Sequence, residues 1–458
     1  MSERRHTILV VDDEASQREL LGGFAVRLGY RVCEAASGEE ALAGIGGESP
    51  DLVLLDVRLP GLSGIETLNR IRESSPDLPV LLITAFADLR QAVAAMKGGA
   101  VDYLAKPVDL DELRVAMADA LGTATAAPQD GEEPMPPLPA DFVGESPAMR
   151  RLLATLTVIA PSKAPVLITG ESGTGKDVIA RLIHAWSPQH AGPMIAANCA
   201  SLPESLIESE LFGHTKGAFT GASETRQGFF RAAHRGSLFL DEIAELPLHL
   251  QPKLLRALEC GQITPVGSDR PIEVDARLIA ATNRNLEQEV AAGRFRDDLY
   301  YRINVVELAI APLRERREDI LPLARRCAGE FAGGPVRMSP QAMNCLLAYP
   351  WPGNVRELRN AIQRACLLCR GDVILPEHLP PKLAVLAGAG HEANATRGRL
   401  SQVERATIVA TLEECGGNRT HAAKKLGISR RALIYKLQAM DNEAAASQTP
   451  AGADREEV

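Results

Sequence analysis

Short apolar runs alternate with helix-like stretches along the first part of the chain. Five runs have the length and hydrophobicity of buried strands, namely TILVV, YRVCEA, DLVLLD, VLLITA and DYLAKP. Each is followed by a segment whose apolar residues recur at helical spacing. Strands that alternate with helices in this way predict a parallel sheet covered on both faces. We therefore expect an α/β domain over residues 1–122.

A second strand and helix pattern occupies residues 141–383. There VLIT runs into a glycine-rich turn and then into VIARLIHAW, whose apolar residues again have helical spacing. Two further apolar runs, GSLFLD and ARLIAATN, read as strands. These segments predict a second and larger α/β domain.

The last patterned region, residues 400–440, contains three helix-like segments, at about 400–414, 419–426 and 430–440. The stretches GGN and GIS separate them, and the short second break predicts an all-α helix-turn-helix.

The stretches between these units predict linkers. Residues 123–140 hold five prolines and should form an extended linker, whereas the Ala/Gly-rich residues 384–399 predict a more flexible one. The tail, 441–458, is expected to be disordered.

Composition places the chain among globular proteins, with 45% hydrophobic and 24% charged residues. No apolar run reaches the roughly 18 residues of a membrane-spanning helix. The N-terminal stretch reads as a strand rather than a secretory signal. We therefore expect a cytoplasmic protein without a membrane partner. The eight cysteines have no regular spacing for disulfides or zinc.

Chemically active side chains stand at four of the five strand ends of the first domain. Asp12 and Asp13 follow the first run, Asp56 ends the third, Thr84 lies near the end of the fourth, and Lys106 follows the fifth. Ligands of parallel sheets bind at these carboxyl ends. Three crowded carboxylates repel one another unless a hard cation such as Mg²⁺ neutralises them. One carboxylate can then attack phosphate, while the ammonium and the hydroxyl stabilise the phosphoryl oxygens.

The stretches VVDDE, LLDVRLPGLSG, LITAF and DYLAKP resemble the receiver domains of two-component response regulators, which have a flavodoxin-like fold. The resemblance implies that Asp56 accepts phosphate from a sensor histidine kinase, and that Asp12 and Asp13 join it in binding Mg²⁺. The residues that it implies as a phosphorylation switch are Thr84, Tyr103 and Lys106. It also implies a cis peptide bond between Lys106 and Pro107.

The stretch VLITGESGTGKD carries the G-x-x-x-x-G-K pattern of a phosphate-binding loop between a strand and a helix. Backbone N–H groups of such a loop surround phosphates, and Lys176 reaches the β and γ oxygens. The expected ATP-binding residues in the loop are Gly170, Glu171, Ser172, Gly173, Thr174, Gly175, Lys176 and Asp177. Asp177 replaces the usual Ser or Thr, so Mg²⁺ must rely more on water and on other carboxylates.

The stretch GSLFLDEI supplies such carboxylates at the end of an apolar strand. Asp241 is expected to bind the Mg²⁺ of ATP, and Glu242 to polarise the attacking water. The next strand ends in Thr282 and Asn283, whose polar side chains are suited to sensing the γ-phosphate beside them.

Most of the second domain resembles the AAA+ ATPase domain of NtrC-class bacterial enhancer-binding proteins, which activate sigma-54 RNA polymerase. The matching stretches are GESGTGKD, ANCASL, ESELFGHTKGAFTGA, GSLFLDEI, AATNRNL, GRFRDDLYYRINV, PLRERREDI and YPWPGNVRELRN. The resemblance implies a small helical lid at about 311–383. An acidic residue after the loop lysine is characteristic of this class, which accounts for Asp177.

The same resemblance implies roles for four residues outside the loop. Arg296 and Arg302 match arginine fingers, which enter the nucleotide site of a neighbouring subunit. Arg356 matches the sensor arginine of the lid, and Asn198 the residue that holds Glu242 until the γ-phosphate is read. Fingers that act across subunits imply a ring, which is a hexamer in this family.

The stretch GAFTGA matches the tip of a mobile loop that touches sigma-54 in this family. The implied contact residues are Gly217, Ala218, Phe219, Thr220, Gly221 and Ala222. The two glycines let the loop bend, and Phe219 supplies an apolar contact. Thr215 departs from the acidic residue expected before KGAFTGA, which leaves the charge contacts of the loop open.

Positive charge is concentrated near the end of the chain. Residues 416–440 hold six Lys or Arg and no acid, although the formal net charge of the chain is -9. Such a segment indicates a nucleic-acid contact. Residues 400–440 resemble the Fis-type DNA-binding domain, which dimerises through its first helix. The expected DNA contacts are Arg419, Lys424, Lys425, Arg430, Arg431, Tyr435 and Lys436.

The preferred hypothesis is a phosphorylation-controlled transcriptional activator. It binds enhancer DNA as a homodimer that assembles into a hexameric ring, and uses ATP hydrolysis to bring sigma-54 polymerase from the closed to the open promoter complex. A DNA-binding repressor without polymerase remodelling is the alternative, against which the intact GAFTGA, Glu242 and both fingers argue. A metabolic ATPase would leave the basic C-terminal unit unexplained.

Overall fold

The computed structural model describes residues 5–84, 98–122, 136–139, 142–219, 222–334, 336–369 and 373–383. Most of the linker 123–140, the linker 384–399, the helix-turn-helix with all its expected DNA contacts, and the tail lie outside this set. The chain divides into two compact units, Met1–Cys327 with Pro350–Asn360 and Ala328–Tyr349 with Ala361–Val458. Among the described helices, none is both long enough and apolar enough to cross a membrane.

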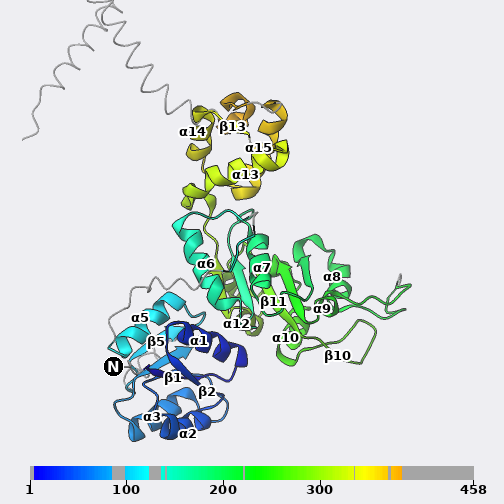
Figure 1. The fold of residues 1–458 in the computed structure, drawn as a ribbon. Coiled ribbons are helices and arrows are strands. Elements are labelled where there is room, and N and C mark those ends of the chain that lie inside the picture. The colour runs from blue at the N-terminus through cyan, green and yellow to red at the C-terminus, as the bar shows by residue number, and fades with distance from the viewer. Residues whose placement is uncertain are drawn as a thin grey trace, which may run out of the picture. The chain divides into compact units, whose positions relative to one another are not determined.

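The first domain contains a five-stranded parallel sheet in the order β2-β1-β3-β4-β5 (Figure 1). Its strands are β1 (Thr7–Val11), β2 (Arg31–Ala35), β3 (Leu52–Asp56), β4 (Val80–Thr84) and β5 (Asp102–Ala105). Its described helices are α1 (Ala15–Arg27), α2 (Gly38–Glu48), α3 (Gly64–Ser74) and α5 (Leu110–Ala120). The predicted parallel α/β fold is confirmed.

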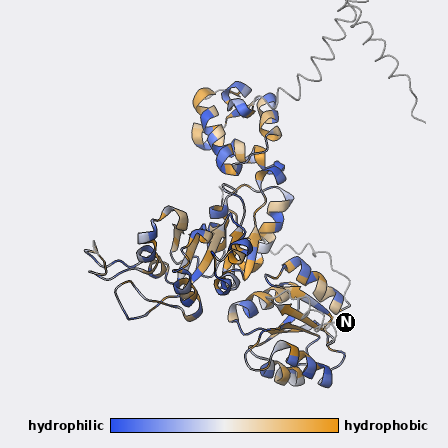
Figure 2. Cartoon of the chain, turned by 180° about the vertical axis from the view of Figure 1, so that it is seen from behind, coloured by the Kyte–Doolittle hydropathy of each residue, from blue (hydrophilic) through white to orange (hydrophobic). Residues whose placement is uncertain are grey.

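The central strands β3 and β4 are buried along their whole length. Alternate side chains enter two different cores, with Leu54 and Leu81 on one face and Val53 and Leu82 on the other. Figure 2 shows the hydrophobic residues concentrated on the strands of this sheet. A parallel sheet covered on both faces needs such continuous apolar strands.

The second domain contains another five-stranded parallel sheet, in the order β12-β6-β11-β8-β7. Its strands are β6 (Val166–Thr169), β7 (Met194–Asn198), β8 (Gly236–Asp241), β11 (Ala276–Thr282) and β12 (Val306–Ala309). Its helices are α6 (Pro147–Ile159), α7 (Lys176–Ala185), α8 (Glu204–Phe212), α9 (Phe229–Ala232), α10 (Gln251–Cys260), α11 (Leu286–Ala291) and α12 (Asp297–Ile303). Short strands β9 (Gln262–Ile263) and β10 (Ile272–Glu273) pair antiparallel.

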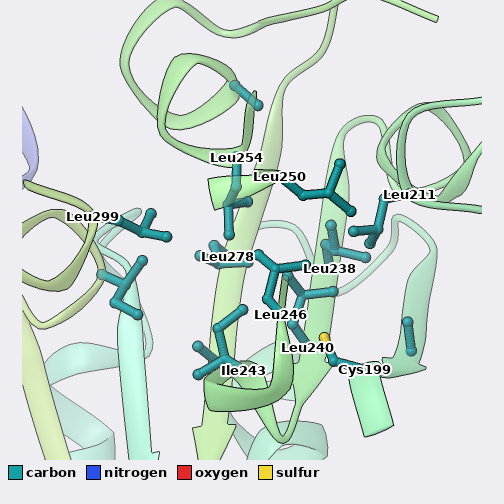
Figure 3. Close-up of a cluster of buried hydrophobic side chains, with 14 of the residues drawn as sticks. Cys199, Leu211, Leu238, Leu240, Ile243, Leu246, Leu250, Leu254, Leu278 and Leu299 are labelled. Carbon is teal, nitrogen blue, oxygen red and sulfur yellow. The ribbon is translucent and has the colours of Figure 1, made fainter. Parts of the chain in front are cut away.

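One core of this domain joins the sheet to the helices α8, α9, α10, α11 and α12. Leu238 and Leu240 of β8, Leu278 of β11, Leu250 and Leu254 all contribute side chains to this core (Figure 3). The core fixes the end of β8 in place, and β8 ends at the acidic pair 241–242.

The region expected to form the lid contains the helices α13 (Ile320–Ala332), α14 (Pro340–Ala348) and α15 (Asn354–Cys369). Strands β13 (Arg337–Met338) and β14 (Val373–Ile374) pair in parallel. Helix α14 begins after Ser339, whose hydroxyl accepts a hydrogen bond from the N–H of Ala342, with a proline in the first turn. Helices dominate the region, as predicted, whereas its expected start at about 311 stays a prediction.

Candidate functional sites

Three carboxylates meet at the carboxyl ends of β1 and β3. One oxygen each of Asp12, Asp13 and Asp56 lies within 4.8 Å of the others. Asp12 and Asp56 are buried, and Asp13 is exposed. They meet because β1 and β3 are parallel neighbours, with Val11 opposite Leu55. A cluster of carboxylate oxygens that is open on one side fits Mg²⁺.

Lys106 lies between the two buried carboxylates. Its Nζ is 2.8 Å from Asp12 Oδ2 and 2.5 Å from Asp56 Oδ2. Burial raises the pKa of Asp12 to about 7, against the opposing charge of Lys106 and with a further rise caused by Asp56. Burial alone would lower the pKa of Lys106, but the two carboxylates raise it above its ordinary value. One ammonium does not balance three carboxylates, which favours a bound cation.

The expected switch residues lie on neighbouring strands. Thr84 is buried at the end of β4 opposite Ala105, and Tyr103 is half-buried opposite Leu82. The peptide bond between Lys106 and Pro107 is cis, as expected. Residues 85–97, which follow Thr84, lie outside the described part of the chain.

The phosphate-binding loop connects β6 to α7, as the pattern predicts. Gly170, Gly173 and Gly175 all have positive φ angles. At Gly173 the requirement is double, because φ is +80° and a Cβ atom would lie 2.6 Å from the carbonyl oxygen of Gly353. A residue with a side chain would therefore distort the loop.

Lys176 is buried at the start of α7. Its Nζ donates to the carbonyl oxygen of Gly170 at 3.0 Å and lies 3.7 Å from Glu242 Oε1. The lysine therefore spans the loop and faces the acidic pair. Asp177 instead pairs with Arg181 at 2.5 Å on the exposed surface of α7. Its carboxylate is thus engaged along the helix in this structure.

The acidic pair stands at the end of β8. Asp241 is the last strand residue, and Glu242 has a left-handed φ of +52°. A non-glycine residue in this conformation stores strain, and such residues cluster at functional sites. Glu242 Oε2 accepts a hydrogen bond from the N–H of Asn283 at 3.2 Å. The neighbouring strand therefore orients the carboxylate of Glu242.

Asn198 contacts a different member of this pair than the resemblance implied. Its Nδ2 donates to Asp241 Oδ2 at 2.8 Å. The strand register explains the difference, since Asn198 of β7 lies directly opposite Asp241 of β8. Glu242 lies one residue beyond the strand, where the chain turns away.

The GAFTGA loop is described up to Phe219 and again from Ala222, so the predicted contact residues Thr220 and Gly221 lie outside the described residues. The Phe219 side chain is 38% exposed. Its ring meets that of His214 edge-on, with centroids 5.0 Å apart. His214 is buried, and its Nδ1 lies 2.6 Å from Ser209 Oγ of α8. One side of Phe219 is thus supported by the ATPase domain while the other is exposed.

Thr215 has a neutral contact at the base of this loop. Its hydroxyl donates to the carbonyl oxygens of Val266, at 3.3 Å, and Gly267, at 3.1 Å. Its backbone N–H donates to Val266 as well, at 3.0 Å. Hydrogen bonds to a neighbouring turn therefore hold the base of the loop at the position where an acidic residue was expected.

The two predicted arginine fingers and the predicted sensor arginine bind different kinds of partner. Arg296 makes a two-point contact with Asp298, at 2.9 and 2.6 Å. Arg302 of α12 donates to the carbonyl oxygen of Leu258 at 3.3 Å. Arg356 Nη1 donates to Ser172 Oγ at 2.8 Å, so this arginine lies against the phosphate loop of its own chain.

Two residues that the motifs did not mark, Arg314 and Asn354, contact the phosphate-binding loop. The carboxylate of Glu171 accepts hydrogen bonds from both Nη1 and Nη2 of Arg314, and from Nδ2 of Asn354. Arg314 above all, and then Asn354, lower the pKa of Glu171 to about 2. Both partners lie in stretches that matched the family, PLRERREDI and YPWPGNVRELRN, but nothing local in the sequence pairs them with Glu171.

Four family models match consecutive parts of the chain. They are the response regulator receiver domain at 8–118, the sigma-54 interaction domain at 142–309, the AAA+ ATPase lid domain at 314–396 and the Fis family of bacterial regulatory proteins at 399–440. Their order is the order of the units expected from the sequence.

Known proteins match the chain along nearly its whole length. The chain is 47% identical to the transcriptional regulatory protein ZraR of Klebsiella oxytoca, over 95% of this chain and 100% of that protein. It is 45% identical to the regulatory protein AtoC of Escherichia coli, over 94% of this chain and 97% of that protein. The crystal structure of NtrX from Brucella abortus in complex with ATP matches with a TM-score of 0.50 and 34% identity, covering 96% of this chain and 100% of that one.

Proposed function

The chain belongs to the family of sigma-54-dependent response regulators, and from this premise we propose how its residues carry a signal to the promoter. It combines a receiver domain, an AAA+ ATPase domain and a Fis-type DNA-binding domain. The proposal is that phosphorylation of the receiver controls an ATP-driven activator of sigma-54 RNA polymerase. A sensor histidine kinase supplies the phosphoryl group, and enhancer DNA holds the protein near its promoters.

Asp56 is the proposed phosphate acceptor. Asp12, Asp13 and Asp56 would hold Mg²⁺, which neutralises charge on the carboxylates and on the incoming phosphoryl group. Lys106, whose Nζ lies 2.5 Å from Asp56 Oδ2, would bind a phosphoryl oxygen on that residue. The buried Thr84 and the half-buried Tyr103 lie on the neighbouring strands β4 and β5 and would respond to phosphorylation.

The observation that carries the ATPase assignment is the grouping of Lys176 and the acidic pair. Lys176 Nζ lies 3.7 Å from Glu242, and Asp241 ends the same strand. We assign phosphate binding to Lys176 and the loop N–H groups, and the Mg²⁺ of ATP to Asp241. Glu242, oriented by Asn283, positions the attacking water.

Arg296 and Arg302 are proposed to act in trans. Each would neutralise transition-state charge in the site of a neighbouring subunit, which requires an oligomer, and the oligomer that we propose is a hexameric ring assembled from dimers. Arg356 would sense the nucleotide within its own subunit, and Asn198 would act through Asp241. ATP, the kinase output and RNA polymerase all meet in the cytoplasm, where we place the protein.

The GAFTGA loop, 217–222, is the proposed output. Its half-exposed Phe219 gives sigma-54 an apolar contact, and the hydrogen-bonded base of the loop ties it to the ATPase domain. Hydrolysis would move this tip and open the promoter complex. No comparison favours the alternative of a repressor; Glu242→Ala protein that supported wild-type promoter output would favour it.

The test replaces Phe219 with alanine. Phe219→Ala should keep ATP hydrolysis within about twofold of wild type, because Phe219 lies outside the nucleotide site, and should abolish open-complex formation at a sigma-54 promoter. Hydrolysis of ATP and promoter melting are measured on the same preparations. Leu206→Ala, which removes another exposed apolar side chain, on α8, is the matched control. Equal loss of hydrolysis and melting in Phe219→Ala would refute the output role.

A further inference from the structure

One buried amide joins three segments of the ATPase domain. The side chain of Asn354 is fully buried. Its Oδ1 accepts a hydrogen bond from the N–H of Leu313 at 2.8 Å. Its Nδ2 donates to Glu171 Oε2 at 3.0 Å and to the carbonyl oxygen of Ser172 at 3.2 Å. Both ends of the amide are therefore used, and two of its three contacts are with the phosphate-binding loop.

The backbone around Asn354 reaches the same loop. Asn354 has a left-handed φ of +50°, a conformation that asparagine tolerates better than most residues. The next residue, Val355, donates its N–H to the carbonyl oxygen of Gly173 at 2.9 Å. Gly173 has no room for a Cβ atom against Gly353. A strained residue held by so many contacts is typical of a functional site.

Arg314, the residue after Leu313, binds the same carboxylate of Glu171. Arg314 makes two hydrogen bonds to Glu171, at 2.9 and 2.6 Å. Both side chains are more than two-fifths exposed, so this ion pair adds little to stability. Its two-point geometry nevertheless fixes the direction of the Glu171 side chain.

We propose that Asn354, with Arg314, is a positioning residue for ATP binding, which holds Glu171 and Ser172 so that the phosphate-binding loop presents its N–H groups to ATP. Glu171 is then the loop residue through which Asn354 and Arg314 hold the loop, and its carboxylate does not contact the nucleotide. Without these contacts, ATP would have to order the glycine-rich loop when it binds. The entropy lost in ordering the loop would weaken the affinity for ATP. The inference rests on the proposed assignment of Gly170–Asp177 as the ATP loop.

The decisive variants separate the contacts of Asn354 from its backbone conformation. Asn354→Gly accepts the positive φ and removes all three side-chain contacts. We expect the KM for ATP to rise about tenfold, equivalent to ~1.4 kcal/mol of binding, while kcat changes by less than about threefold. KM and kcat are measured with the full-length protein, and direct binding with a fluorescent ATP analogue.

An exchange of donor and acceptor tests the contact with Glu171 itself. Asn354→Asp places a carboxylate against Glu171 and should raise KM more than Asn354→Gly does. Adding Glu171→Gln to Asn354→Asp supplies an amide that can donate to the new carboxylate, so the KM should fall back at least severalfold. Failure of the double variant to recover any ATP affinity would overturn the proposed contact.

Two controls separate this role from simple stability and from the site assignment. Asn285→Gly removes a helix-capping side chain whose Oδ1 accepts from the N–H of Gln288, and should lower the melting temperature without changing the KM. If Asn354→Gly behaves in the same way, Asn354 is only structural and the inference is wrong. If Lys176→Ala abolishes ATP binding but the Asn354 variants keep the wild-type KM, the loop assignment stands and the inference fails. If Lys176→Ala binds ATP normally, the loop assignment itself is wrong.

Discussion

Single residues of the ATPase site are held in place in two different ways. Lys176 and Asp241 owe their positions to the helix and strand that carry them. Glu171 is held by groups more than 140 positions away in the chain, Arg314 and Asn354. The first kind of placement follows from a motif and its flanking elements, whereas the second depends on which segments the fold brings together.

Thr215 offers a prediction at this scale. Thr215→Val keeps the shape of the side chain but removes the hydroxyl that donates to Val266 and Gly267. ATP hydrolysis should stay within about twofold of wild type, and open-complex formation should fall severalfold, because the base of the GAFTGA loop loses its tie to the neighbouring turn. Thr155→Val, which removes a hydroxyl that donates to the carbonyl oxygen of Arg151 within α6, is the matched control. A Thr215→Val protein with normal promoter melting would show that the hydroxyl is dispensable.

At the scale of elements, parallel strands act as the positioning devices of both domains. In the receiver, β1 and β3 bring Asp12 and Asp56 together, and β5 delivers Lys106. In the ATPase domain, the register of β7 with β8 sets Asn198 opposite Asp241. The precision of each site therefore depends on the apolar core that locks these strands.

The core beside β8 can be tested with Leu240, which is fully buried directly before the acidic pair. Leu240→Ala should lower the free energy of unfolding of the ATPase domain by about 2–5 kcal/mol, because it leaves a cavity. Denaturant unfolding followed by tryptophan fluorescence reports this domain, since both tryptophans of the chain, Trp186 and Trp351, lie in it. Leu248→Ala, at a half-exposed leucine, should change stability by less than about 0.5 kcal/mol. Equal effects of the two substitutions would contradict the role of the core.

At the scale of the whole molecule, the proposed chemistry needs more than one chain. A finger that acts in trans leaves a single subunit without part of its transition-state stabilisation. Under the proposed function, control by the receiver, hydrolysis in the ring and contact with DNA would be properties of an assembly, each supplied by a different domain.

Mixing two inactive variants tests the assembly. Lys176→Ala disables the nucleotide site but keeps the fingers, and Arg302→Ala does the reverse. Each protein alone should hydrolyse ATP at least about a hundredfold more slowly than wild type, and a mixture should regain a measurable fraction, because intact sites then face intact fingers. The change in ATP hydrolysis when wild-type protein is mixed with either variant shows whether subunits exchange between assemblies. A mixture as inactive as its parts, despite proven exchange, would exclude fingers in trans.

Much of the fold and of the site could be predicted from local patterns. The alternation of strands and helices predicts the parallel sheet of the receiver and the α/β class of the second domain, and the confirmed fold has Asp56, Lys176 and Asp241 at the expected ends of strands or helices. The hydrogen bond from Asn198 to Asp241 depends on the register of β7 with β8, which no local pattern specifies. The motif predicts Glu171 as part of the ATP-binding loop, but no local pattern predicts that Arg314 and Asn354 bind its carboxylate.

The sequence by itself determined the order of the domains, the class of each fold and the residues with chemical potential. These follow from hydrophobic periodicity and from glycine, acidic and basic residues at fixed spacing, which act over a few neighbouring positions. Only the tertiary structure decided that Thr215 ties its loop to the turn at Val266 and that Asn354 supports the phosphate-binding loop. Such contacts join segments far apart in the chain, so their geometry exists only once the strands and helices have packed.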